Sequence, residues 1–197
     1  MSQSITGIIN LNINNIKSVY NASSKFSKCY IINDYKDFKK NTECLIIPGN
    51  GFFYEGIKNL KNKKLFEIIQ NFAFNKKKLI GICLGMQLFM DNSQESENID
   101  GLGIIEGSVN KITNQNYKLP LLGWYNTKFK NNFFSDVNLY FNNKFVCNPT
   151  NKDTIIGYIE NDIPAFIRKD NTFGIQFHPE KSSEHGLKFL EMVLSKF

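Results

Sequence analysis

Residues 79–87 read Leu79-Ile80-Gly81-Ile82-Cys83-Leu84-Gly85-Met86-Gln87, and this stretch decides the fold. Its first four residues form a short apolar run typical of a buried strand, and a helix is expected over 84–90. A strand that passes directly into a helix is the repeating unit of α/β proteins, in which crossover helices connect parallel strands.

Apolar runs on the N-terminal side predict more of the same units. Strands are expected at Ile5–Ile9, 29–32 and 44–47, and the near-continuous apolar character of the last two is typical of parallel strands buried on both faces. Apolar residues at helical spacing predict one helix that starts near Ile16 and one whose apolar side spans 60–72.

The second half of the chain changes character. Short runs rich in aromatic and β-branched residues alternate with Gly, Asn, Asp and Pro, which predicts antiparallel strands added to the sheet. A last helix is expected from about Ser183. The fold class is therefore α/β, with an open, mostly parallel, flavodoxin-like sheet flanked by helices, and residues 1–197 are expected to form one domain. The added strands are expected at 103–105, 127–129, 139–141, 154–159, 165–167 and 172–177.

The composition excludes several classes of protein. With 42% hydrophobic and 21% charged residues over 197 positions, the chain is not a disordered tail. No apolar run approaches the ~20 residues of a membrane span, and the N-terminus has no secretory signal. The net charge of +6 includes lysine runs at 61–64 and 76–78 that lack interleaved aromatic residues. We therefore expect a cytoplasmic protein with no nucleic-acid or membrane partner; an acidic partner protein or an anionic substrate is the alternative explanation for the charge.

Four widely spaced cysteines fit no metal-binding pattern, so neither a metal nor another cofactor is expected. Three of them (Cys29, Cys44 and Cys147) stand in apolar surroundings and are expected to be buried free thiols. Cys83 stands in a G-x-C-x-G sequence, the cysteine counterpart of the G-x-S-x-G nucleophile elbow. The flanking glycines avoid collisions with neighbouring backbone, and unpaired N–H groups at the start of a helix favour a thiolate. The alternative is a core cysteine between two structural glycines.

A thiol nucleophile needs a base, and the chain has only two histidines. His185 falls in the first turn of the last helix, where a surface or capping role is expected. His178 and Glu180 are two residues apart, so in extended chain they project to the same side. They can act as the base and the carboxylate that orients it. The alternative is a histidine at a strand end with an incidental acid nearby.

An oxyanion that forms at Cys83 needs two N–H donors. Leu84 follows the nucleophile and is expected to supply one. The turn at 48–51, Pro48-Gly49-Asn50-Gly51, ends the strand expected beside that of Cys83, and its glycines allow a peptide plane to turn toward a ligand. An ordinary turn is the alternative interpretation.

The chain resembles the class I (triad) glutamine amidotransferases. The order, spacing and total length of its motifs are most similar to those of the glutaminase subunit of imidazole glycerol phosphate synthase. The resemblance covers essentially the whole chain, from Ile8 to the last helix. The motifs are Pro48-Gly49-Asn50-Gly51, Gly81-Ile82-Cys83-Leu84-Gly85-Met86-Gln87 and Gly174-Ile175-Gln176-Phe177-His178-Pro179-Glu180-Lys181-Ser182.

The resemblance implies an enzyme that hydrolyses glutamine to glutamate and ammonia. Cys83 would attack the side-chain amide of glutamine to form a γ-glutamyl thioester. His178 would protonate the departing ammonia and then activate water, while Glu180 fixes the imidazole. The oxyanion- and glutamine-binding positions would be Gly49, Asn50, Gly51, Leu84 and Gln87.

The resemblance also implies a partner. The family passes ammonia to a (β/α)8-barrel cyclase subunit in a heterodimer, where it reacts with a nucleotide of histidine biosynthesis, and Lys181 would lie near that interface. We expect the isolated chain to be weakly active, because the turn at 48–51 needs the partner to set its geometry.

Three alternatives stay open. The loop at 10–15 keeps only the last residue of the family's Asp-Tyr-Gly-x-Gly-Asn, and residues 143–145 read Asn-Lys-Phe where the family has His-Ser-Tyr. These changes suit a paralogue that supplies ammonia for the amidination of bacterial surface sugars. A cysteine hydrolase acting on γ-glutamyl peptides is the second alternative, and a non-enzymatic subunit with a vestigial triad is the third.

Overall fold

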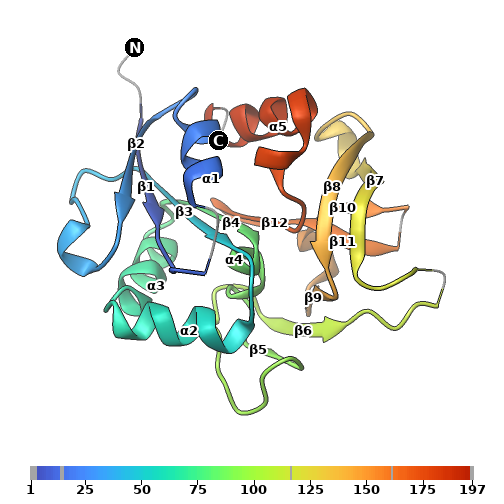
Figure 1. Cartoon of the computed structure of the whole chain (residues 1–197), viewed down its shortest axis with the longest axis horizontal. Coiled ribbons are helices and arrows are strands. Elements are labelled where there is room, and N and C mark those ends of the chain that lie inside the picture. The colour runs from blue at the N-terminus through green and yellow to red at the C-terminus, as the bar shows by residue number, and fades with distance from the viewer. Residues whose placement is uncertain (1–3, 14–15, 116, 161, 196–197) are drawn as a thin grey trace.

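The structure, a computed structural model, describes residues 4–13, 16–115, 117–160 and 162–195. A nine-stranded sheet forms its centre (Figure 1). From one edge to the other its strands are β2 (Lys28–Ile32), β1 (Ile5–Ile9), β3 (Cys44–Gly49), β4 (Lys78–Cys83), β12 (Thr172–Ile175), β11 (Ile163–Lys169), β10 (Ile155–Ile159), β7 (Leu121–Phe129) and β8 (Val137–Asn143).

The sheet has a parallel half and an antiparallel half. Strands β2, β1, β3, β4 and β12 pair in parallel, whereas β12, β11, β10, β7 and β8 pair antiparallel with one another. The predicted strands at 29–32 and 44–47 are confirmed. All six residues of β3 are buried, as expected for a parallel strand with helices on both faces.

Within the described ranges, five α-helices cover the two faces of the sheet. Along β3 the side chains alternate, because Ile46 packs into one apolar core while Leu45 and Ile47 pack into the other. Helices α1 (Ile16–Ser23) and α5 (Ser183–Ser195) lie over the first core (Figure 1). Helices α2 (Phe53–Asn62), α3 (Phe66–Phe74) and α4 (Leu84–Gln87) lie over the second. The predicted α/β architecture is confirmed.

A second, three-stranded sheet lies beside the main one. It consists of β5 (Asn92–Ser93), β6 (Gly107–Lys111) and β9 (Phe145–Pro149). The prediction of a strand at 103–105 is wrong, because Gly103 has no regular secondary structure, residues 104–105 form bends, and the strand starts at Gly107. The described part of the chain also contains four 3-10 helices: η1 (Tyr35–Asp37), η2 (Lys130–Asn132), η3 (Lys152–Thr154) and η4 (Pro179–Lys181).

One strand of the second half has a different orientation from the one predicted. The run at 172–177 was expected to be antiparallel, but β12 pairs in parallel with β4, with Ile175 opposite Ile82. Its other neighbour, β11, is antiparallel. All four residues of β12 are buried, as expected for a strand in the middle of the sheet with both faces covered.

Two helix predictions also need correction. The single helix expected around 60–72 is two helices, because Lys64 adopts a φ of 56° and separates α2 from α3. The helix expected over 84–90 ends at Gln87, so it is a single turn. No helix in the described ranges is both long enough and apolar enough to cross a membrane. In the loop at 10–15, Asn14 and Asn15 lie outside the described residues.

Candidate active site

Three parallel strands bring the predicted functional residues to one edge of the sheet. Gly49, at the end of β3, is the register partner of Cys83 at the end of β4. On the other side of β4, Ile175 of β12 is opposite Ile82, so the chain that continues to His178 leaves beside Cys83. Since the carboxyl ends of parallel strands meet at the same edge, the turn at 48–51 and His178 flank Cys83.

Cys83 sits in a strained backbone conformation between β4 and α4. Its φ is 52° and its ψ is −109°, a region that L-residues avoid and that costs of order 1–3 kcal/mol. Gly85 permits this turn, because a Cβ there would overlap the backbone carbonyl oxygen of Ile47. A Cβ on Gly81 would collide with the backbone of Gly85. The geometry is that of the predicted nucleophile elbow.

The start of α4 offers backbone N–H donors to Cys83, but this short helix has only a small macrodipole. Leu84 is its first residue, and the first N–H groups of a helix have no partner within that helix. A helix of one turn has only a small macrodipole, since the dipole is summed over aligned peptide units. Individual N–H groups are therefore what α4 offers to a negative charge at Cys83.

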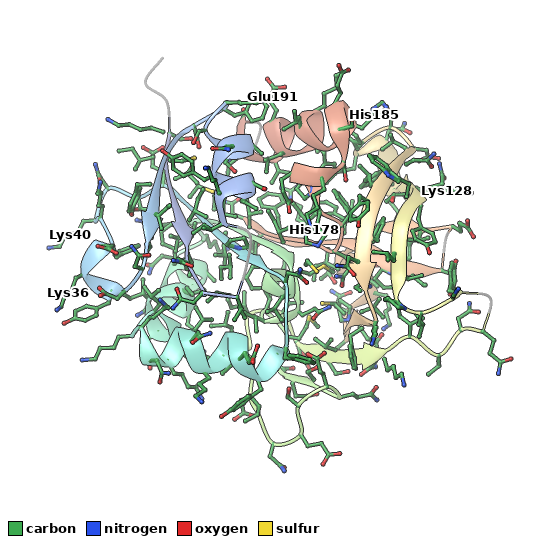
Figure 2. The ribbon with its side chains drawn as sticks, in the orientation of Figure 1. Lys36, Lys40, Lys128, His178, His185 and Glu191 are labelled. Carbon is green, nitrogen blue, oxygen red and sulfur yellow. The ribbon has the colours of Figure 1, made fainter. Side chains whose placement is uncertain are left out.

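His178 and Glu180 form a buried pair. Nδ1 of His178 lies 2.8 Å from Oε1 of Glu180, and each side chain is 4% exposed. The backbone of His178 is also fixed, because its N–H donates to the carbonyl of Tyr140 and its carbonyl accepts from Oγ of Ser182. Figure 2 shows His178 near the centre of the molecule, whereas His185 lies at the outer surface on α5. The expected surface position of His185 is confirmed.

The pKa of the His178 imidazole is shifted strongly upward. Burial opposes protonation, but the negative charge of Cys83, with hydrogen bonds to Cys83 and Glu180, outweighs it and raises the pKa of His178 to about 10. Nε2 of His178 is buried and, among the described residues, has no hydrogen-bond partner of ordinary geometry. This arrangement favours a protonated imidazole at His178, with Nε2 available to the nucleophile.

A cavity opens beside Cys83. Its volume is about 240 Å³, below the ~300 Å³ at which pockets begin to suit drug-sized ligands. Glu95 and Lys144 are the charged residues among those that line it, so the cavity suits a small molecule that carries both charges. Its walls are formed by Asn50, Gly51, Phe52, Cys83, Leu84, Gln87, Glu95, Pro120, Asn142, Asn143, Lys144 and Phe145.

Sequence reasoning did not identify the roles of Glu95 and Lys144 in this wall. Glu95 comes from the loop after β5, where one oxygen accepts from the backbone N–H of Phe53 at 2.7 Å. Lys144 lies between β8 and β9 and is exposed. Lys144 stands at 143–145, where the family has His-Ser-Tyr, but the sequence assigned it no role, and Glu95 belongs to none of the motifs, so only the folded chain brings the two residues to the same cavity.

Gln87 and Lys181 take definite places around the site. The side-chain nitrogen of Gln87 donates to the carbonyl of Phe145 at 3.1 Å and to Oε1 of Gln176 at 3.3 Å, and Gln87 also lines the cavity.

Lys181 is exposed and lines a second cavity of about 20 Å³, on the side of His178 that faces Pro48. That volume is enough for one water-sized molecule.

The other cysteines lie outside this cavity. Cys44 and Cys147 are buried free thiols, as predicted, and burial raises the pKa of Cys44 to about 12 and that of Cys147 further still. Cys29 is only half-buried, because β2 is an edge strand. A larger cavity of about 560 Å³ lies at the start of β12, and neither a cysteine nor a histidine lines it.

Comparisons with known proteins give one consistent answer. The protein-family model described as "Glutamine amidotransferase class-I" matches residues 9–196. The "Imidazole glycerol phosphate synthase subunit HisH" of Methanocaldococcus jannaschii is 36% identical, over 94% of this chain and 96% of that protein. The HisH subunit of Thermotoga maritima is 33% identical, over 95% of each chain. A solved structure described as "Crystal structure of glutamine amidotransferase" has a similar fold, with a TM-score of 0.80 at 14% identity, over 98% of this chain and 99% of that one.

Proposed function

The chain belongs to the class-I glutamine amidotransferase family, and from that premise we propose that it is the glutaminase subunit of imidazole glycerol phosphate synthase. It hydrolyses glutamine to glutamate and ammonia. The observation that carries the proposal is the elbow cysteine Cys83, which interacts with the imidazole of His178. Nδ1 of that imidazole lies 2.8 Å from Oε1 of the buried Glu180. The whole chain serves as one glutaminase domain.

The first half of the reaction forms a thioester. The sulfur of Cys83 forms a bond to the side-chain carbonyl carbon of glutamine, and the carbonyl oxygen takes the negative charge. The N–H of Leu84 and an N–H of the turn at 48–51, from Asn50 or Gly51, donate to that oxygen. The carbon–nitrogen bond then breaks, and His178 gives its proton to the departing amine, which leaves as ammonia.

The second half releases glutamate. His178, now neutral, takes a proton from water, and the resulting hydroxide attacks the thioester carbon. The carbon–sulfur bond breaks and returns the electron pair to Cys83, which restores the thiolate and the imidazolium. Glu180 does not touch the reacting atoms. It keeps the proton on Nδ1 of His178, so that Nε2 faces the substrate.

The charged groups of the cavity suit the amino-acid end of glutamine. Glu95 is placed to accept from the α-ammonium group, while Lys144 is placed to approach the α-carboxylate. Both side-chain hydrogens of Gln87 are engaged with protein oxygens, so it would offer its own oxygen to a donor on the substrate. Gly49 packs against Leu84 and supports the donor turn at its base.

The test is the reactivity of Cys83. The Cys83→Ala variant should release no glutamate from glutamine and should trap no γ-glutamyl adduct, as followed by mass spectrometry of the intact chain. Cys29→Ala is the matched control and should retain full activity, because Cys29 lies on the edge strand β2 away from the cavity. Retained turnover in Cys83→Ala would refute the proposal. A wild-type Cys83 that fails to react with a glutamine-like electrophile at neutral pH would indicate a vestigial triad instead.

The partner is part of the same proposal. The HisH relatives are named as subunits of a synthase. We place this chain in a cytoplasmic heterodimer with a (β/α)8-barrel cyclase that receives the ammonia and completes a lyase reaction of histidine biosynthesis. Lys181 is exposed next to the donor turn and His178, which is a suitable place for a partner to act on the site. The four free cysteines are compatible with the reducing conditions of the cytoplasm.

A reconstitution experiment identifies the ammonia acceptor. Adding the histidine-pathway cyclase should form a 1:1 complex and increase glutamine hydrolysis over that of the isolated chain. Full activity of the isolated chain would contradict the partner requirement. Stimulation by a sugar-modifying subunit instead would assign the chain to the amidination of surface sugars, and a preference for γ-glutamyl peptides over free glutamine would assign it to peptide hydrolysis.

A further inference from the structure

Gln176 is a buried residue in contact with the nucleophile. It follows β12 directly and is completely buried, at 0% exposed. Its side-chain nitrogen Nε2 donates to Sγ of Cys83 over 3.7 Å, and its Oε1 accepts from Nε2 of Gln87 at 3.3 Å. A buried amide needs partners at both ends, and one of the two partners here is the sulfur that does the chemistry.

A backbone carbonyl fixes the orientation of both amides. The carbonyl oxygen of Phe145 can only accept, so Gln87 must direct its side-chain nitrogen toward it. The second hydrogen on that nitrogen then points at Gln176, which has to present its oxygen. The nitrogen of Gln176 is therefore left facing Cys83. We call this chain of contacts, from Phe145 through Gln87 and Gln176 to Cys83, the amide relay.

The sulfur has a competing neighbour. Sγ of Cys83 lies 4.0 Å from the backbone carbonyl oxygen of Asn142, to which a thiol can donate. A thiolate has no proton to donate there, but it accepts well from an N–H group, and hydrogen bonds to an ionised partner are roughly twice as strong as neutral ones. The Asn142 carbonyl thus favours the neutral sulfur, and Gln176 favours the ionised one.

We propose that Gln176 is a positioning residue whose side-chain amide, oriented by Gln87, holds the sulfur of Cys83 in its ionised, cavity-facing state. The inference rests on the proposed function, because it takes Cys83 as the nucleophile of the glutaminase. Gln176 is neutral, so its hydrogen bond stabilises the thiolate of Cys83 and leaves the negative charge on the sulfur. That charge can still attract the protonated imidazole of His178. Gln176 is fully buried and does not line the cavity, so glutamine bound there would not displace it.

The experiment measures Cys83 itself. Alkylation by iodoacetamide is followed across pH 5 to 10 by peptide mass spectrometry, together with the steady-state kinetics of glutamine hydrolysis. Gln176→Met keeps the length of the side chain and removes the donor. A hydrogen bond to a charged group is strong enough to move the midpoint of the alkylation profile up by about 1 pH unit. We expect kcat to fall about tenfold, with KM changed less than twofold.

Two further variants complete the design. Gln87→Met breaks the relay one step earlier and leaves Gln176 in place, so its midpoint should move in the same direction by less. It also tests the inference if Gln176→Met does not fold. Gln94→Met is the matched control, because the Gln94 side chain accepts from Lys111 and does not line the cavity. Its profile should be that of the wild type.

The titratable groups around the sulfur are the same in every variant. They are His178 with Glu180 behind it, Cys147 within electrostatic range, and Glu95 and Lys144 in the cavity wall. A change in midpoint therefore reports the loss of the amide donor. An unchanged midpoint and kcat in a folded Gln176→Met would overturn the positioning role. Absence of alkylation at Cys83 in the wild type would instead overturn the proposed function, so the two failures are distinguishable.

Discussion

Glu180→Gln removes the charge that orients His178 and keeps the size of the side chain. The two bonded atoms are 2.8 Å apart, and both side chains are 4% exposed, so water screens the contact weakly. A hydrogen bond to a charged group contributes about 1.5–3 kcal/mol, and each 1.36 kcal/mol is tenfold in rate. We therefore expect kcat/KM for glutamine to fall roughly 10- to 150-fold.

The same substitution should lower the pKa of His178. Burial lowers this pKa, and the charge of Cys83 together with hydrogen bonds to Cys83 and Glu180 raises it to about 10. Removing one raising cause moves it back toward the ordinary value of 6.5. A pKa raised on folding contributes stability that is fully present below pH 6.5 and is lost as the pH rises through about 10. As the pH rises from 6.5 to about 10, the free energy of unfolding of Glu180→Gln should therefore fall by less than that of the wild type.

Three measurements check this prediction. Glutamate release gives kcat/KM, an NMR titration of the imidazole gives the pKa of His178, and urea unfolding at pH 6.5, 8 and 10 gives the stability. Glu184→Gln is the control, since it removes the same charge at an exposed position of α5 only four residues away. A Glu180→Gln variant with wild-type kcat/KM and an unmoved imidazole titration would refute the assigned role of Glu180.

Three further changes test the site and its surroundings. Lys144→Ala should raise KM for glutamine about two- to fivefold with little change in kcat, as an exposed ion pair is worth at most ~1 kcal/mol; Lys128→Ala, on β7 outside the cavity wall, should leave KM unaltered. Gly85→Ala should destabilise the fold by about 1–3 kcal/mol in urea unfolding, because its Cβ would overlap the carbonyl oxygen of Ile47. Lys181→Glu should raise the Kd for the cyclase subunit in a titration calorimetry experiment, and an unchanged Kd would place the interface elsewhere.

The nucleophile elbow was predictable from the chain because its requirements are local. An apolar run, two glycines and a cysteine occupy consecutive positions, and together they determine a strand, a tight turn and a helix start. The pairing of His178 with Glu180 was predicted from the alternation of extended chain, but that reason was wrong, because Glu180 lies in the 3-10 helix η4 that starts directly after His178. The structure has this contact at 2.8 Å.

Gln176 stands close to His178 in the sequence but was not singled out as a site residue. It lies two residues before His178, and it is a polar residue between the apolar Ile175 and Phe177. An amide in a fully apolar run is a signal that something buried needs a hydrogen bond. The pattern alone does not say whether the partner is Cys83 or another buried group, because that depends on which strand lies alongside.

Strand neighbours were the least predictable feature. The run at 172–177 was correctly identified as a strand, but its parallel pairing with β4 was not foreseen, and that pairing delivers His178 to the same edge as Cys83. The wall residues Glu95 and Lys144 are a comparable case, since they come from loops that are remote from the elbow along the chain. Each depends on packing between distant segments.

By itself, the order of residues determined the strands β1 to β4, the strained turn at Cys83 and the base with its orienting carboxylate, because backbone geometry and side-chain periodicity act over a few residues. Tertiary structure alone decided the parallel place of β12, the cavity between Glu95 and Lys144, and the contact of Gln176 with the sulfur. These features arise when strands far apart in sequence bury their apolar faces together, and no short-range pattern encodes which strands will meet.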